Sequence, residues 1–283
     1  MIKKIIKILL IIFLILILAI FYLSVFGVKT DKFNNQISSN VLKFNKKIKL
    51  NLSDVNYLLN PYNFTINIKT INPQILLEGR KLEIKSIQTN IALKSLINDQ
   101  FSIDDLQITT KEIKVNDIVT FLRIFKNSPK LFILNTFIKD GFVTAKINLN
   151  FDEKGNIKKD YKILGSVKKV KFKILNQVEL KNLNFNFNIN KNNYSLKKIE
   201  MKINNIRTTS SLVEIKKKKN SFFVNGQFLT GNNNFNIKEF KPIFANLFNV
   251  IDIRKVEFSS KNNFSFNVNE NLKFDNFEVE TII

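Results

Sequence analysis

Residues 183–190 alternate strictly between apolar side chains and asparagine. Successive side chains of a β-strand point to opposite faces of its sheet, so such a segment has one apolar and one polar face. The same alternation returns in residues 64–68, 145–151, 201–203 and 264–268, interleaved with Asn, Lys, Ser or Thr. The sequence therefore predicts a mainly β chain built on an amphipathic antiparallel sheet, whose apolar face must be covered by something.

Cysteine and histidine are both absent from the 283 residues. The first absence excludes disulfides, thiolate metal sites and thiol nucleophiles, and the second removes the commonest general base and metal ligand. The sequence also contains neither a glycine-rich phosphate loop nor a nucleophile elbow. We therefore expect no catalytic residues, no metal site and no cofactor, and we do not expect an enzyme.

The formal net charge of +22 raises the question of nucleic-acid binding. Lysine supplies nearly all of the positive charge, and the chain has four arginines, although arginine is the residue that recognises bases and phosphates through paired hydrogen bonds. The lysines alternate along predicted strands, as at Lys171 and Lys173, which is typical of a solvated sheet face. We expect no nucleic-acid partner.

Residues 8–28 carry no charge. At a rise of about 1.5 Å per residue, a helix of this length crosses the hydrocarbon core of a bilayer. A cleaved signal peptide is the alternative, but residues 22–27 fit a small-x-small cleavage site badly. Lys3, Lys4 and Lys7 precede the segment, so the positive-inside rule predicts a cytoplasmic N-terminus. The segment is therefore predicted to be a single-pass anchor, with the bulk of the chain in the periplasm or exterior.

We divide the chain into four parts on these patterns. Residues 1–28 form the transmembrane signal anchor, and residues 29–60 a linker helix and a first strand. Residues 61–230 form the sheet, and residues 231–283 a short helix followed by further strands, which could continue a longer array.

Helices are expected in few places after the anchor. Residues 31–44 have apolar residues at helical spacing, and residues 117–139 form a helical insert with a proline break. Residues 239–248 are apolar around most of their circumference, which predicts a short buried helix. Gly141 then suits a left-handed helix cap, and residues 152–156 a hairpin turn. The strands could close into a sandwich or barrel, or they could form an open curved sheet whose apolar residues line a trough.

The order of these elements resembles the N-terminal part of AsmA-like proteins, which belong with TamB and YhdP to the repeating β-groove group. The resemblance is carried by the lysine-led anchor, the amphipathic helix 31–44, the Asn-Pro turn in residues 70–75 and the leucine-bearing turn in residues 92–106. It implies an elongated, curved antiparallel sheet with a few short capping helices. It also implies a periplasmic protein, anchored in the inner membrane of a Gram-negative bacterium, that binds phospholipid acyl chains or transfers phospholipid toward the outer membrane.

The family has no catalytic residues to transfer to this chain, so the groove can be located only by alternation. Its expected lining residues are Phe64, Ile66, Ile68, Ile147, Leu149, Phe151, Leu183, Phe185, Phe187, Ile189, Met201, Ile203, Phe264 and Phe266. The alternative function is a non-catalytic envelope scaffold or outer-membrane assembly factor, which would bind an outer-membrane or periplasmic protein through exposed strand edges. An open apolar face favours the lipid hypothesis, whereas a closed core with exposed polar edges favours the scaffold.

Overall fold

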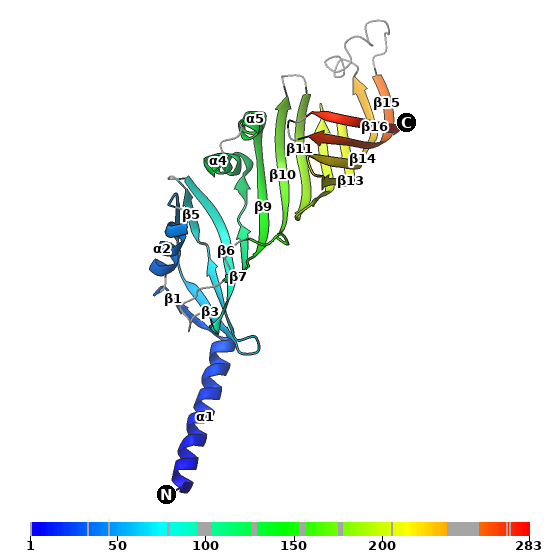
Figure 1. Ribbon diagram of the computed structural model, residues 1–283. Coiled ribbons are helices and arrows are strands. Elements are labelled where there is room, and N and C mark those ends of the chain that lie inside the picture. Colours follow the sequence, from blue (N-terminus) through cyan, green and yellow to red (C-terminus); the bar gives the residue numbers. More distant parts are fainter. Residues whose placement is uncertain are drawn as a thin grey trace. The chain divides into compact units, whose positions relative to one another are not determined.

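The computed structural model describes residues 2–32, 34–44, 46–77, 80–94, 103–125, 129–152, 157–174, 178–204, 206–236, 255–269, 271 and 273–283. The chain is mainly β, with one large antiparallel sheet, an N-terminal apolar helix and a few short helices (Figure 1). The fold class predicted from the alternation is therefore confirmed. Helices 31–44 and 117–139 are found as α2 and as the pair α4 and α5, whereas residues 239–248 and most of the hairpin turn 152–156 lie outside the described residues.

The described helices are α1 (Ile2–Val25), α2 (Asn34–Phe44), α4 (Val115–Phe125) and α5 (Pro129–Phe137). The strands of the first half are β1 (Val28–Thr30), β2 (Ile48–Asn51), β3 (Val55–Asn60), β4 (Thr65–Ile71), β5 (Gln74–Leu77), β6 (Arg80–Ala92), β7 (Ile103–Thr110) and β8 (Ile113–Lys114). Those of the second half are β9 (Ile138–Asn150), β10 (Lys162–Ile174), β11 (Val178–Ile189), β12 (Asn193–Ile203), β13 (Ile206–Lys217), β14 (Ser221–Asn236), β15 (Lys255–Asn269) and β16 (Phe274–Ile282).

The strand order is β1-β3-β4-β6-β7-β9 and then β10 to β16 in sequence, with β2 paired to β5, β5 to β6, and β8 to β9. The pairings among the described strands are antiparallel and join strands that are close in the sequence, as expected of a chain of hairpins. The chain divides into two compact units, residues 1–111 with 147–161 and residues 112–146 with 162–283. We call them unit 1 and unit 2.

Unit 1 contains a small closed core, and α2 packs against its strand β2. Leu77, Ile84 and Val55 are almost completely buried there, with exposed fractions of 0%, 1% and 1%. The helix is fixed to the sheet by its polar side chains, because Ser38 Oγ donates to the carbonyl of Leu50 (2.6 Å) and Asn34 Nδ2 to that of Ser53 (2.6 Å). The amphipathic helix predicted from the sequence thus packs against β2.

α1 is long and apolar enough to cross a membrane, and its most apolar stretch is not buried within the protein. It is followed almost at once by β1, which pairs with β3 through Val28 and Tyr57. Neither β1 nor β3 stands out in the sequence. Val28 belongs to the uncharged run predicted to be an anchor, and β3 reads Val-Asn-Tyr-Leu-Leu-Asn, which lacks a clean alternation.

The prediction that Gly141 caps a helix is wrong. α5 ends at Phe137 and β9 begins at the next residue, so Gly141 lies inside the strand with φ of 134°. A Cβ at this position would overlap Val170 on the neighbouring strand. The glycine is therefore required by the close approach of two strands, since no other residue leaves that space.

Three adjacent strands of unit 2 each contain a β-bulge at a pair of polar residues. The second residue of each pair has a positive φ: 53° at Lys169 in β10, 52° at Asn182 in β11 and 53° at Lys198 in β12. Register shifts mark the same places in the pairing of these strands. The extra residue restores the alternation, so the apolar residues on both sides of each bulge remain on one face of the sheet.

Asn184 connects two of these bulges. Its Oδ1 accepts a hydrogen bond from the backbone N–H of Lys169 (2.8 Å), and its Nδ2 donates to the carbonyl of Asn182 (2.9 Å). The alternating asparagines of residues 183–190 are therefore not equivalent, because Asn186, two residues further on, is simply exposed.

We expect Asn184→Ala to destabilise the protein by about 1 kcal/mol, because it removes hydrogen bonds to two bulges. Asn186→Ala is the matched control and should change the free energy of unfolding by less than about 0.5 kcal/mol, as is usual at exposed positions. The midpoints of denaturant unfolding of the full chain compare the two variants. Equal effects at both positions would contradict the role of Asn184.

Candidate functional site: the apolar face of the sheet

The apolar face of unit 1 is built from rows of side chains that cross four strands. Paired residues of β3, β4, β6 and β7 lie side by side in the ladder, so their side chains share one face. The rows are Leu59, Ile66, Ile91 and Ile103; Tyr57, Ile68, Thr89 and Leu106; and Val55, Thr70, Ile87 and Ile108. Burial of Tyr57, in the second row, raises the pKa of its phenol above the usual value for tyrosine.

The apolar face of unit 2 is built in the same way from β10 to β16. Its central row consists of Gly165, Phe187, Leu196, Val213, Gly226, Phe264 and Val279. The neighbouring row consists of Ile163, Ile189, Tyr194, Ile215, Val224 and Phe266.

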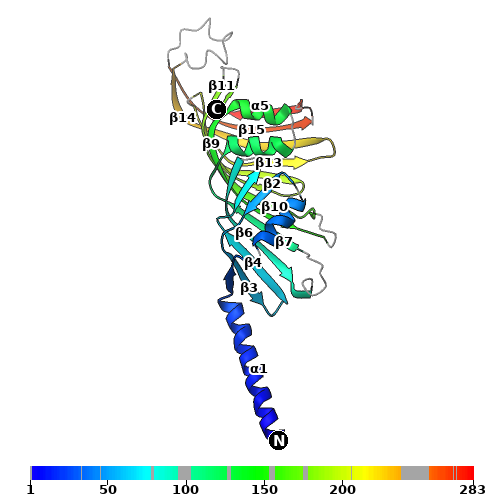
Figure 2. The ribbon, with the colours of Figure 1, turned by 90° about the vertical axis from the view of Figure 1, so that its left-hand side faces the viewer.

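Little of this face is covered by a second layer of described residues, although Met201 and Val213 are buried on it. α5 lies in front of the strands of its unit in Figure 2, and its Phe137 ring contacts that of Phe172 in β10 at a centroid distance of 5.5 Å. Away from that contact, Phe185, Phe187 and Phe266 are half-buried, unlike the core residues of unit 1. They touch neighbours on the same face but no second layer of the described residues closes over them.

Aromatic rings are continuous over the C-terminal part of the face. The ring centroids of Phe228 and Phe264 lie 5.0 Å apart, those of Phe264 and Phe266 6.0 Å, and those of Phe266 and Phe277 5.9 Å. Phenylalanine has no polar group, so this strip offers dispersion contacts without fixing a ligand by hydrogen bonds.

Two glycines make room for phenylalanine rings in the central row. A Cβ at Gly165 would overlap the ring of Phe187 and the carbonyl oxygen of Thr144, and a Cβ at Gly226 would lie 2.9 Å from Cζ of Phe264. Each ring therefore lies over the backbone of the adjacent strand, an arrangement in which the aromatic side chain shields the glycine.

The structure brings the predicted groove residues together in two sets. Leu183, Phe185, Phe187, Ile189, Met201, Ile203, Phe264 and Phe266 share the apolar face of unit 2. Ile66 and Ile68 lie on the apolar face of unit 1.

The remaining four residues are placed differently. Ile147 and Leu149 alternate with polar residues along β9 and are half-buried, and Phe151 follows that strand and forms an isolated bridge with Ile157. Phe64 lies in the turn before β4 with 71% of its surface exposed and φ of 49°. Alternation alone could not distinguish a turn residue from the strand that it precedes.

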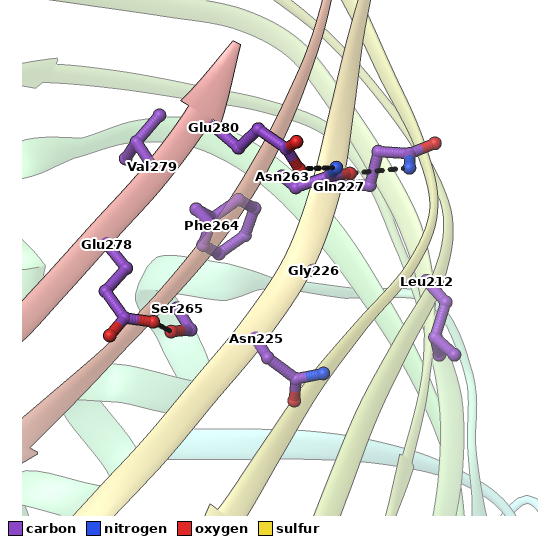
Figure 3. A pocket seen from close by; sticks show the side chains of 10 residues that line it. All are labelled: Leu212, Asn225, Gly226, Gln227, Asn263, Phe264, Ser265, Glu278, Val279 and Glu280. Carbon is purple, nitrogen blue, oxygen red and sulfur yellow. Dashed lines mark hydrogen bonds between the residues drawn. The ribbon is translucent and has the colours of Figure 1, made fainter.

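The opposite, polar face of β13 to β16 contains a hollow of about 500 Å³, shown in Figure 3. Gln227 Nε2 donates to Asn263 Oδ1 (2.8 Å), and Asn263 Nδ2 donates to Glu280 Oε2 (2.9 Å). Glu278 Oε2 accepts a hydrogen bond from Ser265 (3.2 Å). These side chains satisfy one another, and the described residues contain no cluster of acidic side chains that could hold a metal ion. This hollow is therefore a polar surface feature and offers no site for acyl chains.

Neither a protein-family model, nor a curated protein, nor a solved structure matches this chain. Function therefore has to be inferred from the two faces of the sheet and from α1. Of these, the apolar face of unit 2 most restricts the possible functions, because large exposed apolar surfaces mark sites of binding.

We expect Gly165→Ala to destabilise unit 2 by about 1–3 kcal/mol, because the new methyl group must displace the Phe187 ring or a backbone carbonyl. Gly231→Ala is the control, since a Cβ there meets nothing within 4 Å. That change should be neutral or slightly stabilising. The free energies of denaturant unfolding measure both effects, and a tolerated Gly165→Ala would show that Phe187 does not lie over the glycine.

Proposed function

We propose that this chain is a membrane-anchored lipid-binding protein, in which the apolar face of the sheet holds phospholipid acyl chains. The observation that carries the proposal is that Phe185, Phe187 and Phe266 are only half-buried. They lie on the apolar face of unit 2, on which no second layer of the described residues packs over them. Side chains of this kind stay in contact with water unless a ligand covers them.

Acyl chains suit such a surface energetically. Each methylene removed from water contributes about 0.8 kcal/mol, so covering about eight of them contributes about 6 kcal/mol. A row of phenylalanine and aliphatic side chains has no polar group that fixes an acyl chain at one point. The same surface therefore permits sliding along the sheet, as transfer between membranes requires.

The proposal assigns α1 to a membrane. Its length and composition support a single-pass anchor. The three lysines before residue 8 favour a cytoplasmic N-terminus, with the sheet in the periplasm. Together with the resemblance to AsmA-like proteins, this supports an inner-membrane protein that binds phospholipid or passes it toward the outer membrane.

A second candidate function is a scaffold that recruits another protein through a strand edge. β16 supports it, because this strand pairs only with β15 among the described strands and all nine of its residues are exposed. An edge of this kind can accept a further strand by backbone hydrogen bonds. The partner would be an outer-membrane or periplasmic protein.

The anchor is tested by fractionation and by topology. We expect the full chain to remain in the membrane fraction after carbonate washing, and a reporter fused after Ile283 to be active in the periplasm and inactive in the cytoplasm. Release of the chain by carbonate would overturn the anchor. Cytoplasmic reporter activity would reverse the orientation.

The lipid site is tested by photocrosslinking in cells. Benzoylphenylalanine at Phe185 or Phe266 resembles the native side chain and should yield phospholipid adducts, because both positions lie on the apolar face. Asn186 is the matched control, since it follows Phe185 in β11 but is exposed on the polar face. Phe187 is avoided because its ring lies over Gly165.

Adducts at positions 185 and 266 without adducts at position 186 are the expected result. Folded protein that gives no lipid adduct at either apolar position would exclude the lipid hypothesis. Protein adducts from position 279 in β16 under the same conditions would then favour the scaffold, since that strand forms the free edge.

A further inference from the structure

The turn between β3 and β4 exposes two aromatic side chains within three residues. Tyr62 is 93% exposed and Phe64 is 71% exposed. A single exposed aromatic residue is ordinary, but two at the tip of one turn present a compact apolar surface with one phenol group. Side chains of this kind are enriched where proteins meet the membrane–water interface.

The turn lies at the same end of unit 1 as α1. Two residues separate α1 from β1, and β1 pairs with β3 so that Val28 lies opposite Tyr57. Since the two strands are antiparallel, β3 runs toward α1, as its position in Figure 1 also shows. Asn60, the last residue of β3, is three residues beyond Tyr57 and so about 10 Å nearer the α1 side at the usual rise of a strand.

The junction between α1 and the sheet is tightly packed. Gly27 has φ of 67°, and a Cβ at this position would lie 2.6 Å from the carbonyl oxygen of Tyr57 and 3.1 Å from the Leu58 side chain. Only glycine fits both the backbone conformation and the space. The end of α1 is therefore held directly against β3, and the turn that follows β3 has a defined position next to the helix.

The turn itself is held in one conformation. Asn60 Oδ1 accepts hydrogen bonds from the backbone N–H groups of Tyr62 (3.1 Å) and Asn63 (3.2 Å), and the carbonyl of Phe64 accepts one from the N–H of Leu93 (2.8 Å). Phe64 has a left-handed backbone, with φ of 49°, which is rare and strained for a bulky residue. Strain of this kind persists where the surroundings enforce it, and it occurs preferentially at functional sites.

We infer that Tyr62 and Phe64 form a second membrane contact, which inserts into the interface of the leaflet from which α1 emerges. The occupant of this surface is the bilayer itself, because the same unit carries the apolar helix beside it. The inference rests on the proposed anchoring of α1. It adds that unit 1 contacts the lipid surface directly, so that Leu59 and Ile66 at the adjacent end of its apolar face lie where an acyl chain would leave the bilayer.

The test uses the absence of tryptophan from the chain, so that one substitution introduces one fluorophore. The full chain is reconstituted in phosphatidylethanolamine–phosphatidylglycerol vesicles whose acyl chains carry bromine either near the headgroup or near the bilayer centre. Tyr62→Trp reports on the turn. Ile71→Trp is the matched control, because Ile71 is also exposed, at 53%, but lies at the far end of β4. Leu14→Trp reports on α1.

We expect Tyr62→Trp to lose fluorescence with bromine near the headgroup, and Ile71→Trp to be unaffected by either lipid. Leu14→Trp should be quenched by bromine near the bilayer centre. Quenching of Leu14→Trp without quenching of Tyr62→Trp would overturn the membrane contact and leave the anchor intact. Failure to quench Leu14→Trp would overturn the anchor and, with it, this inference.

Discussion

The structure depends on one constraint: a single sheet must keep its apolar side chains on one face while its strands twist and bend. Strict alternation achieves this only in regular strands. In β10, β11 and β12 the constraint is met by an inserted residue with positive φ, which is Lys169, Asn182 and Lys198 respectively. Without the insertion, half of each strand would turn its apolar residues toward the polar face. The bulges therefore preserve the apolar face and also add local twist where they occur.

The same constraint separates a closed part of the molecule from an open one. Leu77 and Ile84 in unit 1 have lost almost all contact with water, whereas Phe185 and Phe266 in unit 2 are only half-buried. Cross-strand pairs contribute about 0.2–1 kcal/mol each, so the open part gains less per residue than a core that is fully buried. A ligand bound to this face would add the missing burial, and it would stabilise the folded chain by an amount that grows with its concentration relative to its Kd.

The period of two residues was sufficient to predict most strands, the fold class and the polarity of each face. It was insufficient where contacts with another segment of the chain decided the local structure. β1 adjoins the apolar helix α1 and is recognisable only through its pairing with β3, and the role of Gly141 depends on Val170 in another strand. The bulges do have a sequence signal, since Val-Lys-Lys-Val, Leu-Lys-Asn-Leu and Leu-Lys-Lys-Ile each place two polar residues between apolar ones. The groove residues could be assigned to a face in this way, but which residues share a row depends on register and could not be read from one strand alone.

The face and the free edge of the sheet are physically connected in unit 2. Phe274, Phe277 and Val279 of β16 belong to the apolar face, and the Asn276 bulge, with φ of 50°, keeps Phe274 and Phe277 on the same side. A strand added to the edge of β16 would therefore extend the apolar face by one more row. The two proposed functions, lipid binding and strand pairing, are thus compatible on one sheet, because the first would use side chains and the second the backbone. A partner strand with alternating apolar residues would satisfy the backbone of β16 and lengthen the apolar surface that we propose for acyl chains.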